Sequence, residues 1–278
     1  MKYTFIIFIL LIFSSCSSIH RKIFSSTQIN NPSLQQKKDH SFSLAYSTPS
    51  GFDFNGGYAI TNRLAIIGGA YTHKNRDEEE AYSIFSRYNA SSRLLYRHKG
   101  FHGGAGAYFP LSKKNHENIV SFFAGYTTGS FRMDETLYEN SPDTSAPARV
   151  SFYKSNINRY FLQGSINIYS KNYEFSFISR YNYVGYANVV TDYTTNEQQS
   201  FRLPPLGYPK YSDFLDLAFE SKFYLTNNPQ IGLQIFGSIT PRLKRREFNF
   251  DYYPFRLGIG LVLKNPFKKN LNKKVSFL

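Results

Sequence analysis

Residues 213–225 read DFLDLAFESKFYL, and the apolar residues of this stretch fall on every second position. One set of alternate positions holds Leu215, Leu217, Phe219, Phe223 and Leu225, and the other set includes Asp216, Glu220 and Lys222. Successive residues of a β-strand point to opposite faces, so a period of two predicts a strand with one apolar and one polar face.

The same alternation recurs along the chain after residue 20, where no segment has convincing helical periodicity. We predict ten strands, over residues 41–47, 52–60, 63–73, 99–110, 118–129, 156–169, 172–187, 212–225, 229–240 and 253–264. Most of them have the roughly 9–11 residues or more that a tilted strand needs to cross a membrane. The predicted fold class is therefore all-β.

The connections between these strands alternate in length. Short connections occupy 61–62, 111–117, 170–171 and 226–228, and long ones occupy 74–98, 130–155, 188–211 and 241–252. Residues 82–97 are strand-like, and we interpret them as a hairpin within the first long loop. Alternating short and long connections with an even strand count are typical of outer-membrane barrels, whose short turns face the periplasm. We therefore predict an antiparallel up-and-down transmembrane β-barrel of about ten strands, with both chain termini on the periplasmic side.

A soluble β-barrel or sandwich also alternates, so the membrane prediction rests on further features. Aromatic residues gather toward strand ends, as in membrane girdles, at Phe52, Phe54, Tyr173, Phe223 and Phe255. The last strand carries the pattern Arg256, Gly258, Leu261 and Leu263, which resembles the signal that the barrel-assembly machinery recognises on final strands. The chain departs from that signal by continuing to Leu278 in a Lys-rich tail.

The N-terminus has the pattern of a secreted lipoprotein. Phe5–Phe13 (FIIFILLIF) is too short to span a bilayer as a helix, and Ser14, Ser15 and Cys16 follow it. This resembles a lipobox, with Phe13 where the usual box has Leu; ordinary cleavage that leaves a free thiol is the alternative. We predict a signal peptide over 1–15, a flexible tether over 16–40 lipidated at Cys16, the barrel over 41–264 and a basic periplasmic tail over 265–278.

The formal net charge of +14 is unevenly distributed. Five lysines lie within 264–278, and four cations against one carboxylate lie within 17–40. Basic flanks of this kind fit outer-membrane lipid, a protein or a cell-wall polymer as partner, and we expect no nucleic-acid partner. The single cysteine excludes a disulfide framework and a Cys-rich zinc site.

Three stretches resemble a known family. They are GFDFNGGYAITNRLAI at 51–66, GGAGAYF at 103–109 and FAGY at 123–126. Together they resemble small predicted outer-membrane β-barrel lipoproteins of Gram-negative bacteria. The resemblance covers about 41–263 and implies an architecture, and it assigns no catalytic residue.

Candidate chemistry is limited to one loop. His73, His98 and His102 flank the acidic run Asp77–Glu80, where an outer-rim hydrolase or a metal site would be possible. A solvated loop is the interpretation that we favour. There is no nucleophile elbow, HExxH or P-loop. The sequence therefore predicts no enzyme, no cofactor and no metal site.

The polar faces predict what fills the barrel. If the apolar faces meet lipid, the charged residues that point inward are Asp53, Glu174, Arg180, Asp216, Glu220, Lys222 and Arg256. A barrel of this size is largely filled, and buried charges must pair. Counting from the short turns predicts the cross-strand pairs Glu174–Lys222 and Arg180–Asp216. We expect an outer-membrane lipoprotein with a structural or binding role and little ion conductance; a small-solute pore is the alternative.

Overall fold

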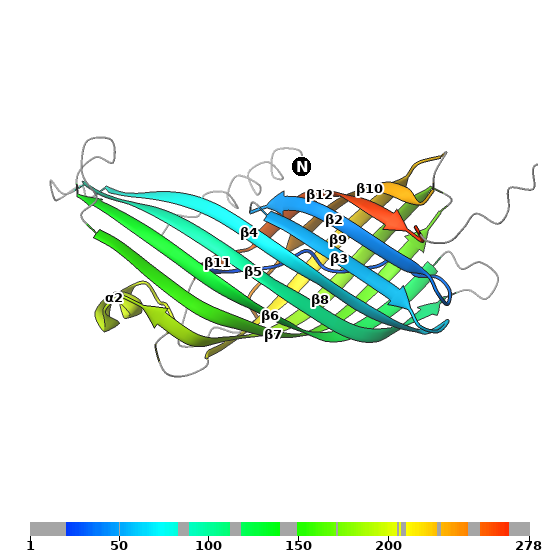
Figure 1. The fold of residues 1–278 in the computed structure, drawn as a ribbon, viewed down its shortest axis with the longest axis horizontal. Helices are drawn as coiled ribbons and strands as arrows, with labels where there is room; N and C mark the ends of the chain where they lie inside the picture. Colours follow the sequence, from blue (N-terminus) through cyan, green and yellow to red (C-terminus); the bar gives the residue numbers. More distant parts are fainter. Residues whose placement is uncertain are drawn as a thin grey trace, which may run out of the picture.

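The computed structural model describes residues 21–49, 51–82, 89–111, 118–139, 149–170, 172–204, 206, 210–226, 229–243 and 251–266. The fold is a closed antiparallel barrel of ten strands in the order β10-β12-β2-β3-β4-β5-β6-β7-β8-β9 (Figure 1). Its strands are β2 (His40–Thr48), β3 (Gly51–Ala59), β4 (Leu64–Tyr82), β5 (Asn89–Pro110), β6 (Asn118–Glu139), β7 (Arg149–Tyr169), β8 (Tyr173–Thr191), β9 (Lys210–Tyr224), β10 (Ile231–Ile239) and β12 (Phe255–Lys264). The predicted fold class and strand number are thus confirmed.

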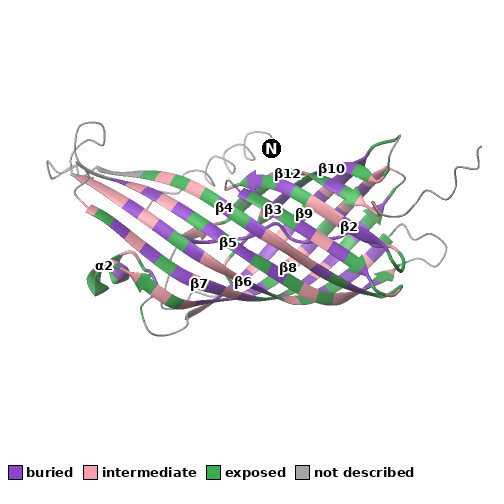
Figure 2. Ribbon diagram, in the orientation of Figure 1, coloured by how far each residue is buried: buried purple, intermediate pink, exposed green. Residues whose placement is uncertain are grey.

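Burial alternates along most of the length of the wall strands, as the banding in Figure 2 shows. On β9, Phe219 is 46% exposed, whereas its neighbour Glu220 is 2% exposed. On β12, Leu261 is 60% exposed and Arg256 is 1% exposed. The apolar faces therefore point outward and the polar faces point into the lumen, as the alternation predicts.

The two ends of the barrel differ. At the short-turn end, residues 60–63 join β3 to β4 and residues 170–172 join β7 to β8. At the long-strand end, β4 to β8 extend beyond the rest of the wall, with 19 to 22 residues each against 9 in β2, β3 and β10. Among the described residues, no helix is long and apolar enough to cross a bilayer.

The long strands correct two predicted loops. Much of 74–98 and 130–155 is strand, and residues 89–97 belong to β5 rather than to a separate hairpin. The alternation continues there with inverted polarity, because Tyr96 faces the lumen while its neighbour Arg97 is exposed on the outer surface. Above the apolar core of the membrane the outer face of a strand meets headgroups and water, so polar residues outside and apolar residues inside are the stable arrangement. In the predicted loop 188–211, β8 continues to Thr191 and a short helix, α2 (Thr195–Ser200), follows it.

Residues 21–35 run through the lumen, and Lys37 and Lys38 after them are exposed at the short-turn end. This corrects the described part of the flexible tether predicted over 16–40. The short strand β1 (Lys22–Ser25) pairs in parallel with β11 (Asp251–Tyr253), which directly precedes β12 at the long-strand end. At the other end, the Lys37 amide donates to Asn62 Oδ1 in a short turn (2.8 Å). We call residues 21–36 the plug.

The described chain thus begins and ends at opposite ends of the barrel. Arg21 lies at the long-strand end, and the residues after β12 lie at the short-turn end, where the Asn265 amide donates to the His40 carbonyl (2.7 Å). The prediction that both chain termini share the periplasmic side concerns residues outside the described ones. The predicted signal peptide, the lipidation site Cys16 and most of the basic tail lie outside the described residues.

Candidate functional site

The middle of the lumen holds the plug through an ion pair. Arg256 donates to an Asp53 carboxylate oxygen and also to the backbone carbonyl of Ser26 in the plug. The other Asp53 oxygen accepts from the backbone amide of Gln28 (3.2 Å). The Asp53–Arg256 pair therefore makes hydrogen bonds to one carbonyl and one amide of the extended plug. In a solvated chain, water would make these bonds.

A second ion pair lies beside the first. Arg180 Nε and Nη2 donate to Asp216 Oδ2 (2.9 and 2.7 Å), and Nη2 also donates to the Thr27 carbonyl (3.0 Å). Arg159 donates to the hydroxyls of Thr27 (2.9 Å) and Thr127 (3.0 Å). Among the described residues no carboxylate lies within ion-pair distance of Arg159, so the plug supplies one of its few acceptors.

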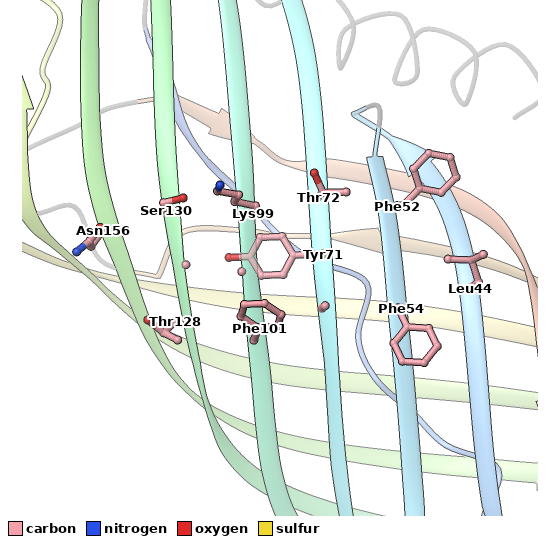
Figure 3. A pocket seen from close by; sticks show the side chains of 13 residues that line it. Leu44, Phe52, Phe54, Tyr71, Thr72, Lys99, Phe101, Thr128, Ser130 and Asn156 are labelled. Atoms are coloured by element: carbon pink, nitrogen blue, oxygen red, sulfur yellow. The ribbon is translucent and has the colours of Figure 1, made fainter.

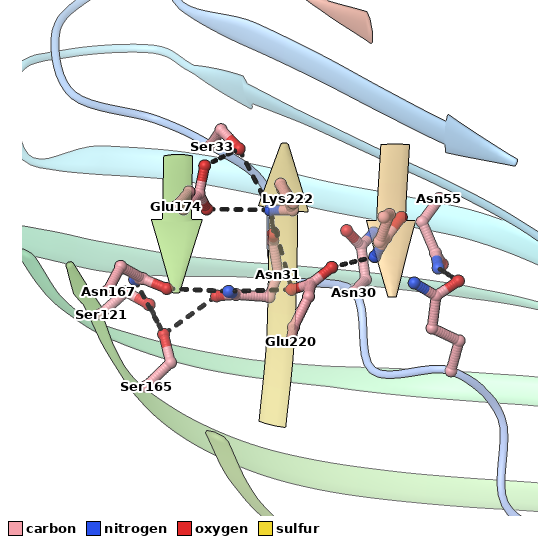
Figure 4. A network of polar contacts seen from close by, with 12 residues as sticks. Asn30, Asn31, Ser33, Asn55, Ser121, Ser165, Asn167, Glu174, Glu220 and Lys222 are labelled. Atoms are coloured by element: carbon pink, nitrogen blue, oxygen red, sulfur yellow. Dashed lines mark hydrogen bonds and ion pairs between the residues drawn. The ribbon is translucent and has the colours of Figure 1, made fainter. Parts of the chain in front are cut away.

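Nearer the short-turn end, a polar network surrounds Asn31 and Ser33 of the plug (Figure 4). Lys222 Nζ donates to Glu174 Oε1 (2.9 Å), to the Asn31 carbonyl (2.8 Å) and to the Ser33 hydroxyl (3.0 Å). The Asn31 side-chain amide donates to Glu220 Oε2 (3.2 Å). These charged side chains are all at most 2% exposed, so the plug takes the place of solvent around them.

On the opposite wall, glycines let the plug approach closely. The Asn30 side-chain amide donates to the carbonyls of Gly56 and Gly68, each at 2.9 Å. A Cβ atom built on Gly57 would lie 2.5 Å from Pro32, closer than any real contact. The wall is therefore shaped to the plug here, since only a residue without a side chain fits at position 57.

Toward the long-strand end, the plug is held by apolar contacts as well as by charge. Phe24 stacks on Phe214 with ring centroids 4.3 Å apart, within an apolar cluster of the lumen. Arg21 donates to Glu135, which also accepts from the Tyr193 hydroxyl. Burial, and then the neighbouring Glu135 carboxylate, raise the pKa of the Tyr193 phenol, so it stays protonated and donates. This end of the lumen is closed around the plug.

The seven charged residues predicted to face the lumen are all buried there, each at most 3% exposed. The structure contains both expected pairs, because Glu174 lies opposite Lys222 and Arg180 lies opposite Asp216 in the β8–β9 register. The plug is what sequence reasoning missed. Its one signal is the stretch Ser25–Asn31, in which every residue but Ile29 carries a hydroxyl or an amide. Such a stretch complements charged walls and carries no charge of its own.

The histidines do not form the outer-rim site considered above. His73 lies opposite His98 in the β4–β5 register, but both are buried in the lumen. Arg256 donates to His73 Nε2 (2.9 Å), and that nitrogen is also the atom nearest Asp53 (3.3 Å). Because an arginine always donates, Nε2 accepts and cannot give a proton to Asp53. Among the described residues there is no group of three ligands suited to a metal ion.

Comparisons with known proteins bear on the fold. The chain is similar to the crystal structure of the outer membrane protease OmpT from Escherichia coli, with a TM-score of 0.50 and 10% sequence identity over 81% of this chain and 92% of that one. It has the fold of an outer-membrane β-barrel. No protein-family model and no curated protein matches the sequence. An identity this low establishes the architecture and assigns no activity.

Proposed function

We propose that this protein is a non-conducting outer-membrane lipoprotein, with no enzymatic activity, that displays its own N-terminus at the cell surface. The observation that carries the proposal is the path of the plug. Arg21 bonds to Glu135 at the long-strand end, and Lys37 bonds to Asn62 at the short-turn end. Short turns face the periplasm in outer-membrane barrels, so the chain that precedes Arg21 belongs to the outer side.

The position of the predicted anchor follows from chain length. Cys16 precedes Arg21 by five residues, and a fully extended chain spans at most about 3.6 Å per residue. The cysteine therefore stays within about 18 Å of the outer mouth of the lumen. Acyl chains on Cys16 would enter the outer leaflet, with the barrel serving as the passage that holds the tether. This replaces the periplasmic anchor expected from the sequence.

The pore and the outer-rim hydrolase have weaker support. The plug lies buried along the lumen and occupies the charged groups that would line a channel. The pair His73–Asp53 is bonded to Arg256 and is at most 2% exposed, so no substrate reaches it. Protease activity is a property of OmpT, the protein of similar fold. No arrangement of the described residues supports that activity in this chain.

The test is the side on which the N-terminal segment is accessible. An epitope inserted after Ser18 should be labelled by antibody on intact cells. The same epitope inserted after Asn62, in a short turn, serves as the matched control and should be labelled only after the outer membrane is permeabilised. Labelling of the first insertion only in permeabilised cells would contradict the proposal, provided that both proteins fold, as judged by migration of unboiled samples on SDS gels.

A further inference from the structure

Four consecutive strands carry a cation at one level on the outer surface. Lys74 on β4 lies opposite Arg97 on β5, Arg97 lies opposite Arg132 on β6, and Arg132 lies opposite Lys154 on β7. All four side chains are exposed. We call these residues the basic row.

The row is poorly compensated within the protein. Asp134 is the acceptor for two of its members, with Oδ1 2.8 Å from Arg132 Nε and Oδ2 3.1 Å from Arg97 Nη1. Within the described part of the chain, no carboxylate lies within ion-pair distance of Lys74 or Lys154. Like charges directly opposite each other destabilise a sheet. The arrangement is therefore one that an external anion would stabilise.

The row lies at the height of lipid headgroups. Lys74 follows Leu64, the outward residue at the start of β4, by ten positions. A strand rises about 3.3 Å per residue, and a tilt near 40° makes this about 25 Å along the membrane normal, the usual height of the apolar band. At the long-strand ends of β10 and β12, the residues that the structure describes present Ile239 and Phe255 outward instead of cations.

An apolar groove lies directly below the row on the same face (Figure 3). Its volume is about 610 Å³, and its lining includes Phe52, Phe54, Phe101 and Ala70. Lys99 lies on the border of the groove and is exposed. On β5 it is the next outward-facing residue after Arg97. The groove therefore faces the hydrocarbon region, with its charged border toward the headgroups.

We propose that this face binds an anionic lipid of the outer leaflet, whose phosphate lies on the basic row and whose acyl chain lies in the groove. The charge of the row selects phosphate over zwitterionic headgroups, since each juxtamembrane cation adds to the attraction for anionic lipid. The groove selects a lipid over free phosphate because it offers an acyl chain apolar contacts that a free phosphate does not make.

The experiment measures lipid retention by the full-length protein. The protein is reconstituted in phosphatidylcholine nanodiscs containing a minor fraction of phosphatidic acid, and the lipid retained after transfer to detergent is counted by native mass spectrometry. We expect K74Q/K154Q to retain about tenfold less phosphatidic acid than the unmodified protein. The control K37Q/R63Q loses the same charge at exposed positions of the short-turn end and should retain it fully.

A second pair of variants tests the groove. Ala70→Phe fills the groove without adding a polar atom, and Ala124→Phe adds the same bulk to an outward position that does not line it. Only the first should lower retention. Equal retention by K74Q/K154Q and K37Q/R63Q would overturn the proposal. Displacement of the lipid by inorganic phosphate, or no effect of Ala70→Phe, would also overturn it in favour of a simple anion site.

Discussion

Replacement of Lys222 by Met should destabilise the barrel strongly. The Lys222 ammonium is bonded to Glu174, Asn31 and Ser33 and lies 3.7 Å from Glu220 Oε2, with a side chain only 2% exposed. Removing one partner of a buried ion pair costs about 3–5 kcal/mol, because the remaining charge stays buried without compensation. We expect a loss of this size in the free energy of unfolding, far above the ~0.5 kcal/mol typical of surface changes.

The assay is urea unfolding in phosphatidylcholine vesicles, with the folded fraction read from the band shift of unboiled samples on SDS gels. Arg63→Met, at an exposed turn position, is the control for loss of a cation. The double variant K222M/E174M should recover at least half of the loss, because Glu220 keeps its bonds from Asn31 and Gln234. A loss below about 1 kcal/mol for Lys222→Met would refute the reasoning, as would a double variant no better than the single one.

Three further outcomes follow from the sequence and the fold. Radiolabelled palmitate should label the unmodified protein and not Cys16→Ser, and equal labelling of both would exclude lipidation at this residue. Changing Leu261 and Leu263 together to Asp should prevent assembly, because both side chains face lipid, at 60% and 40% exposure; normal heat-dependent migration of this variant on SDS gels would contradict that. Gly57→Val should loosen the plug by collision with Pro32 and increase proteolysis of the N-terminal segment in folded protein, while unchanged proteolysis would show that the close approach is unimportant.

The wall of the barrel was predictable because lipid imposes a strict rule on it. Most side chains that face lipid must be apolar, so a period of two indicates which residues face inward. The short turns then fix the register: Glu174 lies just after one turn and Lys222 just before the next, and the two are direct partners across β8 and β9.

The plug was not predictable from the same evidence. Its residues, such as Thr27 and Asn31, are polar and uncharged, which is equally typical of a solvated linker. In this barrel the lumen takes the place of water, since Arg180 and Lys222 donate to plug carbonyls as water would. The polar composition of a segment indicates that its side chains need hydrogen-bond partners. It does not indicate whether solvent or protein provides those partners.

The extension of the strands was missed for a related reason. Tyr96 and Phe131 face the lumen above the apolar band, and their neighbours Arg97 and Arg132 are exposed on the outer surface. The alternation of polar and apolar residues persists there, but the apolar residues face the lumen and the charged residues face outward. Judged by its charge alone, such a stretch resembles a loop.

The bond from Arg256 to the Ser26 carbonyl joins residues 230 positions apart in the chain. It also joins the closing strand to the plug, because β12 completes the wall by pairing with β2, which directly follows the plug. Acyl chains on Cys16, as proposed above, would keep this terminus from being threaded through a lumen whose wall is already closed. On that proposal the seam between β12 and β2 closes last, around a segment already in place, and the plug serves as a template for assembly. Contacts of such long range form slowly, and an assembly factor that holds the seam open until the template is seated would act on the slowest step.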